Sequence, residues 1–480
     1  MPIATINTWL QAIAALFVRN WLTMLGGICA TIGSLLIIAF FAHEWLTGEV
    51  SAFLALFGFL LLPAIFVLGL LLIPLGAWRD RRRRRKAREA GLPEPAPYPV
   101  FDLNNPITRR AVALVAFLTI VNIFIISTVT FRGVHYSESA EFCGTMCHDI
   151  MEPQYAAFLE SPHSRVDCTK CHTRPGAIGF VEQKIAGMRE VYAKLTDTYP
   201  QPLPVPVEHL PETAETCEQC HNPLENRGDV LRVTRKFRGD EANTPITSVL
   251  VMHLGGGGNP GIHGWHNDPD VVTEYYAHDD AREDIAYVRV TGGDGEITEY
   301  MVDDEDFDPE DISPDELRRM DCTDCHNRTG HPFAMPDQGL DRKMAAGLVS
   351  PEIPYIKARG VEVLEAAAEA DDGPAYIANE LRAYYQNEHP GVYAEQEEAL
   401  ERAIAEIQDV YQKNVFPYMN VTWETYPDHI GHTRYEGCYR CHNTQLRTEN
   451  NQPIGQNCLS CHQVVAWDQH EPDILQVLGL

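Results

Sequence analysis

The feature that most constrains this chain is a pair of cysteines followed directly by a histidine, repeated along the sequence. Cys-x-x-Cys-His occurs five times, at Cys168, Cys171 and His172, at Cys217, Cys220 and His221, at Cys322, Cys325 and His326, at Cys438, Cys441 and His442, and at Cys458, Cys461 and His462. A sixth copy is one residue longer and reads Cys143-Gly-Thr-Met-Cys147-His148. Two thiols one helical turn apart can each form a thioether to a haem vinyl group, and the adjacent histidine then ligates the iron. The pattern predicts six covalent c-type haems.

Other uses of paired cysteines fit this chain less well. A single Cys-x-x-Cys pair also occurs in zinc ribbons, redox dithiols and disulfides. Those sites do not require a histidine after every pair, and here every pair has one. Of the 13 cysteines only Cys29 lies outside the six motifs. The cysteines therefore favour an electron-transfer protein.

Three long apolar runs lie before residue 131, at about 21–41, 52–78 and 111–130, and each is long enough to cross a bilayer as a helix. Between the second and third runs stands a basic block that contains Arg79, Arg81 to Arg85, Lys86 and Arg88. Because basic loops stay in the cytoplasm, the amino terminus is expected inside and the chain after about Thr130 outside. Haem attachment is expected on that same side. The sequence predicts a protein of the bacterial inner (cytoplasmic) membrane with its haem domain in the periplasm, and no cleaved signal peptide.

The exported part of the chain is strongly acidic. After residue 134 it holds 26 Lys and Arg against 61 Asp and Glu. Such a surface repels nucleic acid and steers basic partners toward the protein. We therefore expect no nucleic-acid partner, and a periplasmic cytochrome or other redox partner with a basic docking face. Solubility alone would also account for the charge.

The fold class expected is a mainly α multihaem cytochrome c with low regular secondary structure, transmembrane helices at the amino terminus and a small β-rich insertion. Strands are predicted at 231–237, 247–254, 285–291 and 297–302, where β-branched residues partly alternate between glycine runs. Helical patterns follow at 339–348, 355–370, 375–387 and 392–414, and an amphipathic one at 178–195. The predicted domains are a three-helix membrane anchor (1–134), a three-haem region (135–225), a β-rich insertion (226–312) and a helical carboxy-terminal three-haem region (313–480).

One segment carries a family resemblance. Residues 143–172 read CGTMCHDIMEPQYAAFLESPHSRVDCTKCH, with Met151, Ser161-Pro-His163 and a second haem motif in order. This resembles the NapC/NirT/NrfH family of membrane-anchored quinol dehydrogenases over about residues 130–225. The resemblance implies a first haem close to the membrane and a membrane quinol, menaquinol or ubiquinol, as electron donor. It also implies that Lys184 lies beside the quinol and that Glu190 lies near the first haem.

The chain departs from that family in several ways. It has three apolar runs where one is usual, six motifs where four or five are typical, and an extra residue in the first motif. These features resemble the larger inner-membrane cytochromes of metal-reducing bacteria. Met151 follows His148 by three residues where two is more usual. The axial ligand of the first haem, His148 or Met151, therefore stays open.

The second axial ligands must come from the remaining histidines. His163 is implied by the family resemblance, and His331 and His432 are favoured because each lies near a motif in the sequence. Weaker candidates are His253, His263, His389 and His429. His266 is a further possible ligand, because it lies with His253 and His263 close to the four-glycine run at 255–258. The apolar runs contain no histidine, with His43 at the edge of the first, so a b-type haem between membrane helices is not expected.

The expected function is a membrane-bound hexahaem cytochrome that oxidises quinol at the outer leaflet and relays electrons to periplasmic acceptors. Lys184 would orient a quinol oxygen and Glu190 would accept a proton. Three alternatives remain from the sequence: a quinone reductase that runs in the reverse direction, a terminal reductase with one open haem, and a fixed subunit of a larger respiratory complex.

Overall fold

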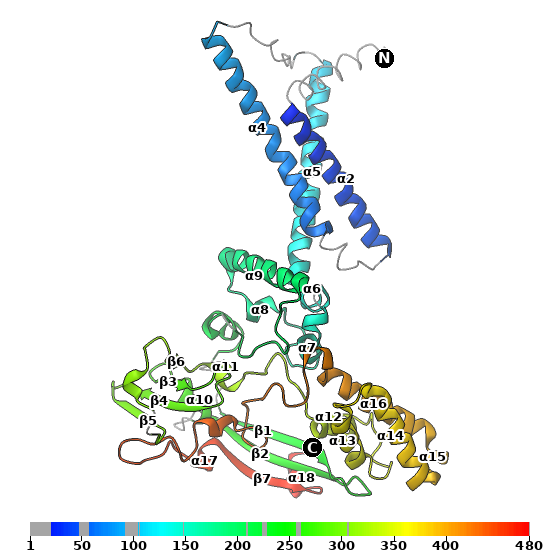
Figure 1. The fold of residues 1–480 in the computed structure, drawn as a ribbon, viewed down its shortest axis with the longest axis vertical. Coiled ribbons are helices and arrows are strands. Elements are labelled where there is room, and N and C mark those ends of the chain that lie inside the picture. Colours follow the sequence, from blue (N-terminus) through cyan, green and yellow to red (C-terminus); the bar gives the residue numbers. More distant parts are fainter. Residues whose placement is uncertain are drawn as a thin grey trace. The chain divides into compact units, whose positions relative to one another are not determined.

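The computed structural model describes residues 21–47, 57–91, 104, 106–146, 148–207, 210–222, 228–255, 261–304 and 307–479. The chain divides into two compact units, Met1–Ser137 and Glu138–Leu480. The ribbon in Figure 1 gives the helices and strands of each unit. Cys147 lies outside the described residues, as do the side chain of His148 and parts of the predicted second apolar run.

The first unit consists of long apolar helices: α2 (Trp21–Thr47), the short π-helix η1 (Phe57–Leu61), α4 (Leu62–Glu89) and α5 (Pro106–Glu138). Among the described residues, the stretch Trp21–Phe40 and the helix Leu62–Glu89 are long and apolar enough to cross a bilayer. The third predicted run falls inside α5, which is an unbroken helix of 33 residues. Apolar helices at the amino terminus are therefore confirmed, while three membrane crossings stay a prediction.

Helices α2 and α4 approach each other closely through small residues. A Cβ placed on Gly26 would lie 2.7 Å from the carbonyl oxygen of Gly69, so neither position tolerates a side chain without a shift. Such small-residue contacts are common between membrane helices, because close backbone approach increases van der Waals packing. Phe40 and Phe66 are buried at this contact.

The basic block between the second and third apolar runs is helical, and its predicted cytoplasmic location stays a prediction. Arg79 to Arg88 continue α4 as helix to Glu89. Arginine and lysine have high helix propensity. An ion pair at 2.8 Å between Arg84 and Asp80, one helical turn apart, further stabilises this part of α4.

The second unit contains two antiparallel sheets. One has the strand order β1-β2-β7, formed by β1 (Gly228–Phe237), β2 (Pro245–Gly255) and β7 (His462–Gln469). The other has the order β5-β4-β3-β6, formed by β3 (Val272–Ala277), β4 (Ile285–Thr291), β5 (Ile297–Met301) and β6 (Arg318–Arg319). The four predicted strands are confirmed as β1, β2, β4 and β5.

Strand β7 was not predicted, and it changes how the β-rich stretch is built. It pairs with β2, with Met252 opposite His462 and Thr247 opposite Gln469. The sheet therefore combines residues 228–255 with the last haem motif, more than 200 residues later. The predicted domain boundaries at 134, 225 and 312 remain predictions.

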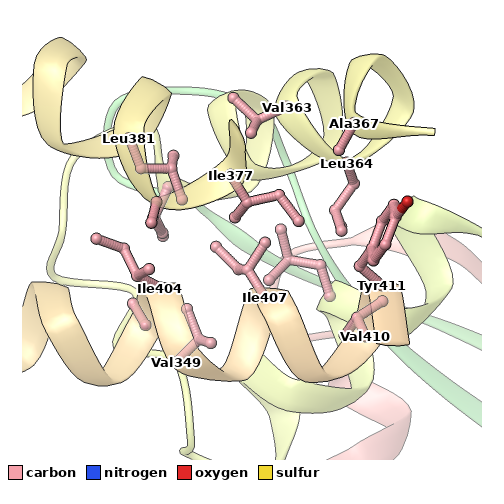
Figure 2. Close-up of a cluster of buried hydrophobic side chains, with 14 of the residues drawn as sticks. Val349, Val363, Leu364, Ala367, Ile377, Leu381, Ile404, Ile407, Val410 and Tyr411 are labelled. Atoms are coloured by element: carbon pink, nitrogen blue, oxygen red, sulfur yellow. The ribbon is translucent and has the colours of Figure 1, made fainter. Parts of the chain in front are cut away.

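Helices α12 (Pro336–Ala345), α13 (Ile356–Ala367), α14 (Gly373–Glu388), α15 (Pro390–Glu395) and α16 (Glu397–Asn414) form a bundle between the fourth and fifth motifs. Figure 2 shows its core, where Leu364, Ile377 and Leu381 face Ile404 and Ile407 of α16. Asp372 caps α14 by accepting a hydrogen bond from the backbone N–H of Ala375. The bundle covers all four helical patterns predicted in this region, and the last of them splits into α15 and α16 at Gln396.

Candidate haem and quinol sites

The five regular motifs adopt the same local structure. Each forms one short helical turn, namely α8 (Thr169–His172), η3 (Cys217–Gln219), α11 (Cys322–Cys325), η6 (Gly437–Arg440) and α17 (Cys458–Cys461). In each motif the histidine backbone N–H donates a hydrogen bond to the carbonyl of the first cysteine, four residues earlier. This turn brings two thiols and an imidazole to one side of the chain, as attachment of a c-type haem requires.

The stretched motif is arranged differently. Helix α6 (Ala140–Met146) carries Cys143, and α7 (His148–Leu159) begins at the motif histidine. Gly144 packs against the ring of Tyr155 so closely that a Cβ there would lie 2.3 Å from it. Glycine is thus required where α6 lies over α7. Met151 is half-buried on α7, one turn after His148.

Every histidine of the five regular motifs faces a second histidine from another part of the chain. The distances between ring centres are 6.0 Å for His172 and His331, 6.0 Å for His221 and His163, 6.3 Å for His326 and His263, 5.8 Å for His442 and His266, and 6.1 Å for His462 and His432. Histidine nitrogens bind transition metals at about 2 Å, so two imidazoles on opposite sides of one iron have ring centres roughly 6 Å apart. The residues therefore fit five bis-histidine haems.

Hydrogen bonds hold several of these rings in place. Nδ1 of His266 lies 2.7 Å from the carbonyl of Ile262, and Nδ1 of His331 lies 2.9 Å from that of Gln154. Nδ1 of His442 lies 2.7 Å from the carbonyl of Gly455. Because a carbonyl only accepts, Nδ1 carries the proton and Nε2 is left for the metal.

Burial also keeps the rings neutral, which is the form that coordinates iron. It lowers the pKa of His331 to about 4. Burial likewise lowers the pKa of His172, His266, His326 and His462.

The six motifs follow one another in space in their sequence order. The thiol of Cys143 hydrogen-bonds that of Cys168, which joins the first and second motifs. The later motifs lie near enough for their thiols to interact electrostatically, and the interacting pairs are Cys171 with Cys217 and Cys220, Cys322 with Cys217, Cys325 with Cys438 and Cys441, and Cys461 with Cys438. Among the described residues, each motif interacts in this way with the next one in the sequence, so the six form one series.

A buried polar network fixes the fourth motif against the fifth. Asp324, inside the fourth motif, accepts hydrogen bonds from the hydroxyl of Tyr275 at 2.6 Å and from Nε of Arg318 at 2.9 Å. Arg440, inside the fifth motif, donates to the carbonyl oxygens of Arg282 and Asp324. Burial by itself would raise the pKa of Asp324, but the bonds from Arg318 and Tyr275 outweigh it and lower that pKa. The residues between the cysteines thus set how two motifs meet.

Three of the weaker candidate histidines have other neighbours. His253 pairs with Asp229 at 2.8 Å, and His389 packs against the rings of Tyr384 and Tyr385. His429 is buried between Glu283, at 2.8 Å, and the carbonyl of Asp324. Among the described residues, none of these three rings is paired with a motif histidine in the way that His163 is paired with His221. The fourth weaker candidate, His263, does face a motif histidine, as do the other predicted ligands His163, His331 and His432.

His266, which was raised with His253 and His263 as a possible haem ligand, faces the motif histidine His442. It lies three residues after His263 on α10 (Gly261–His266), so one short helix presents two rings to two different motifs. The signal was present as a pair of histidines one helical turn apart, the spacing at which two side chains share a helix face.

The candidate quinol residues lie on α9 (Gly176–Thr196), near the first motif. Lys184 and Glu190 both interact electrostatically with Cys143. Burial lowers the pKa of Lys184, and the charge of Glu138 opposes this. The ammonium group lies 4.9 Å above the ring of Phe180. A cation and a carboxylate thus lie near the first attachment cysteine, and an aromatic ring lies beside the cation.

Comparisons with known proteins agree with this arrangement. The model of the NapC/NirT cytochrome c family, N-terminal region, matches residues 106–203. Attachment motifs and apolar helices with this match define a membrane-anchored c-type cytochrome, and the chain belongs to the NapC/NirT family. It is 37% identical over 454 residues to the cytochrome c-type protein ImcH of Geobacter sulfurreducens, which covers 94% of this chain and 88% of that protein. The predicted family resemblance is thereby confirmed. No solved structure matches the chain.

Proposed function

We propose that this protein is a hexahaem cytochrome of the bacterial inner membrane that oxidises quinol at the outer leaflet and relays electrons to periplasmic acceptors. The observation that carries the proposal is the set of five facing histidine pairs in a single series of motifs. Haem bound there supplies one-electron acceptance and release. The chain supplies attachment, axial ligands and spacing.

The ligand assignment within this proposal is specific. His172, His221, His326, His442 and His462 are the motif ligands, and the ring that faces each of them is its second ligand. The first haem is attached through Cys143 and Cys147, with His148 or Met151 as its axial ligand. The Asp324 and Arg440 network holds the fourth and fifth sites at a fixed separation.

The quinol end of the series is the first motif. Lys184 donates a hydrogen bond to a quinol oxygen, and Glu190 accepts a proton as the quinol is oxidised. The lowered pKa of Lys184 and its position near Cys143 support this role. At the other end, the sixth motif and the acidic surface suit a basic periplasmic cytochrome.

The alternative of a terminal reductase needs one iron with an open position. In the fourth, fifth and sixth motifs the motif histidine faces a second ring, which supports six-coordinate iron at each. The reverse direction, reduction of quinone by an external donor, uses the same residues and differs only in potentials and partners.

The test is optical and EPR spectroscopy of the haem-loaded full chain in lipid nanodiscs, before and after addition of a menaquinol analogue. A low-spin ferric starting state and rapid appearance of reduced c-type bands are expected. Lys184→Gln should slow reduction by quinol about tenfold and leave reduction by dithionite unchanged. Lys194→Gln, on the same helix, is the control and should match the parent protein.

Two results would overturn the proposal. Reduction by dithionite but not by quinol would favour the reverse direction, which electron donation from a reduced partner to quinone would then demonstrate. A high-spin haem that binds small anions in the parent protein would favour a terminal reductase.

A further inference from the structure

One side of α9 carries a line of large apolar side chains that are exposed. They occur at alternating intervals of three and four residues, so all six fall on one stripe of the helix. Their exposed fractions run from 46% to 75% for Ile178, Val181, Ile185, Met188, Tyr192 and Leu195. We call this set the apolar stripe. An unpaired apolar face of this length on an otherwise acidic unit indicates a binding surface.

The apolar stripe points away from the first haem motif. Lys184 and Glu190 are the residues of α9 that interact with Cys143, and the side-chain oxygen of Gln183 is buried. Lys184, Gln183 and Glu190 define the side of α9 that faces the haem motif. At 3.6 residues per turn, the centre of the stripe is rotated about the helix axis by roughly a third of a turn or more from the centre of that side. The haem side and the exposed side of α9 are therefore different.

The position of α9 relates the stripe to the membrane anchor. Lys184 interacts electrostatically with Glu138, the last residue of α5. Helix α5 contains the third apolar run, at 111–130. The middle of α9 is thus near Glu138, the first residue of the second unit, which follows the end of that run by eight residues. Figure 1 shows α9 next to α6 and α8 within this unit.

We propose that the apolar stripe of α9 binds the surface of the lipid bilayer that anchors the chain. In this arrangement α9 lies parallel to the bilayer, with the stripe at the boundary between headgroups and acyl chains. Tyr192 is amphipathic, as is common at that depth. This binding does not depend on the quinol reaction.

The charged residues of α9 also favour a lipid surface as the partner that binds the apolar stripe. Helix α9 contains three basic and two acidic residues, although the chain after residue 134 has a large acidic excess. Arg189 flanks the stripe on the side away from Lys184, where it can meet lipid phosphates. The rest of the acidic surface would be repelled by the same phosphates.

A second copy of the chain is the competing occupant. The alternation of three and four residues also suits a seam between two helices. The bilayer is favoured because Lys184 of α9 interacts with Glu138, which follows the end of the predicted span by only eight residues. The stripe also covers under three heptads, which is short for a stable two-helix seam.

The test uses the haem-loaded full chain in nanodiscs that contain phosphatidylglycerol, with Cys29→Ser to remove the unattached thiol. Single cysteines are introduced by Met188→Cys and Tyr192→Cys in the stripe and by Ala186→Cys as the control, since Ala186 is exposed on the same helix but outside the stripe. The rate of labelling by a water-soluble maleimide should be at least about tenfold slower in the stripe than at the control position. A nitroxide at the stripe positions should be more accessible to oxygen than to a nickel chelate.

Equal labelling rates, or a nitroxide more accessible to the nickel chelate, would overturn the proposal. Efficient Met188→Cys disulfide dimers under mild oxidation would assign the stripe to a second copy instead. Haem content and reduction by dithionite check assembly of each variant, and Leu195→Cys replaces any that fails. Neither readout requires quinol oxidation, so failure here and failure of the proposed function are distinguishable.

Discussion

The helix bundle and the haem-bearing segments of the second unit are held together in different ways. The bundle has a core of 21 buried hydrophobic residues, and between Pro336 and Asn414 it contains one histidine and no cysteine. The clusters beside the motifs contain only five and four buried hydrophobic residues. Around the motifs the shared features are short turns, thiols and facing imidazoles. The bundle is stabilised by burial of apolar surface, and the motif segments are organised for covalent and metal bonds.

This contrast indicates that the bundle serves packing and the motif segments serve haem binding. The bundle lies between the fourth and fifth motifs in sequence, and yet these motifs are in contact through Asp324 and Arg440. An inserted module of this kind adds a rigid body without lengthening the series of haem sites. It also predicts that haem and packing can be perturbed separately.

The largest effect is expected from removal of haem. In a chain produced without haem attachment, the motif segments should open, because their few buried contacts do not offset the entropy of ordering them. The bundle should keep its fold. Hydrogen exchange is the measurement, and amides of α13, α14 and α16 should exchange about 100-fold or more slowly than amides of the motif turns. Equal amide exchange rates in the bundle and in the motif turns would show that the bundle does not fold independently of haem.

The next effect concerns a single haem. His266→Ala removes the ring that faces His442 and should convert one haem to a high-spin ferric state. His389→Ala, which changes the histidine of the bundle, is the control and should leave the spectrum unchanged. EPR of the oxidised protein measures both. A fully low-spin His266→Ala protein would show that another group ligates that iron.

Packing is tested within the bundle alone. Leu364 is fully buried, and Leu364→Ala should destabilise the bundle by about 2–5 kcal/mol through lost burial and a cavity. Leu348, which is 47% exposed, gives a matched Leu→Ala control that should cost less than about 1 kcal/mol. Native-state hydrogen exchange of the bundle is the readout, with haem absorbance expected to stay constant. A change in the haem bands would mean that the two regions are coupled.

The smallest effect is electrostatic. Burial would raise the pKa of Asp409, but hydrogen bonds from Lys343 at 2.6 Å and Lys413 at 2.9 Å lower it below its usual range. A carboxyl whose pKa is depressed in the folded state stabilises above its unfolded pKa, near 3.9, and this stabilisation is lost as pH falls through the folded pKa.

Because Asp409 is partly exposed, Asp409→Asn should cost about 1 kcal/mol or less at pH 7. The difference from the parent protein should shrink as pH falls below about 3.9 and vanish below the folded pKa. The control is Glu398→Gln, which breaks an exposed pair with Arg402 and should have almost no effect. Hydrogen exchange of α16 across this pH range is the measurement. A cost that does not depend on pH would exclude the ion pairs as its source.

Much of the local structure could be predicted from the sequence. Alternating β-branched residues marked β1, β2, β4 and β5, and helical periodicity marked α9 and the bundle. These signals are local, because the side chains that define them are neighbours in the chain. The helical state of the arginine block was not predicted, because charge in a loop and charge on a helix extension have the same composition.

The candidate site was predictable in part. The attachment cysteines and motif histidines follow from spacing, since both thiols must reach one haem from a single turn. Strand β7 was missed because its residues begin at the histidine of the last motif, which directed attention to the haem site. The spacing of His263 and His266 indicated two rings on one helix face, but it could not indicate which motif each ring would face.

The sequence by itself determined the attachment motifs, the apolar runs and the periodicity of the main elements, because each depends on residues within one or two turns. Only the tertiary structure decided which histidine faces which motif, how the motifs follow one another and that β7 completes the sheet of β1 and β2. His172 and His331 are joined by no local pattern. They meet because the chain path between them brings two distant turns to the same side of one site, and such contacts depend on packing of the whole unit.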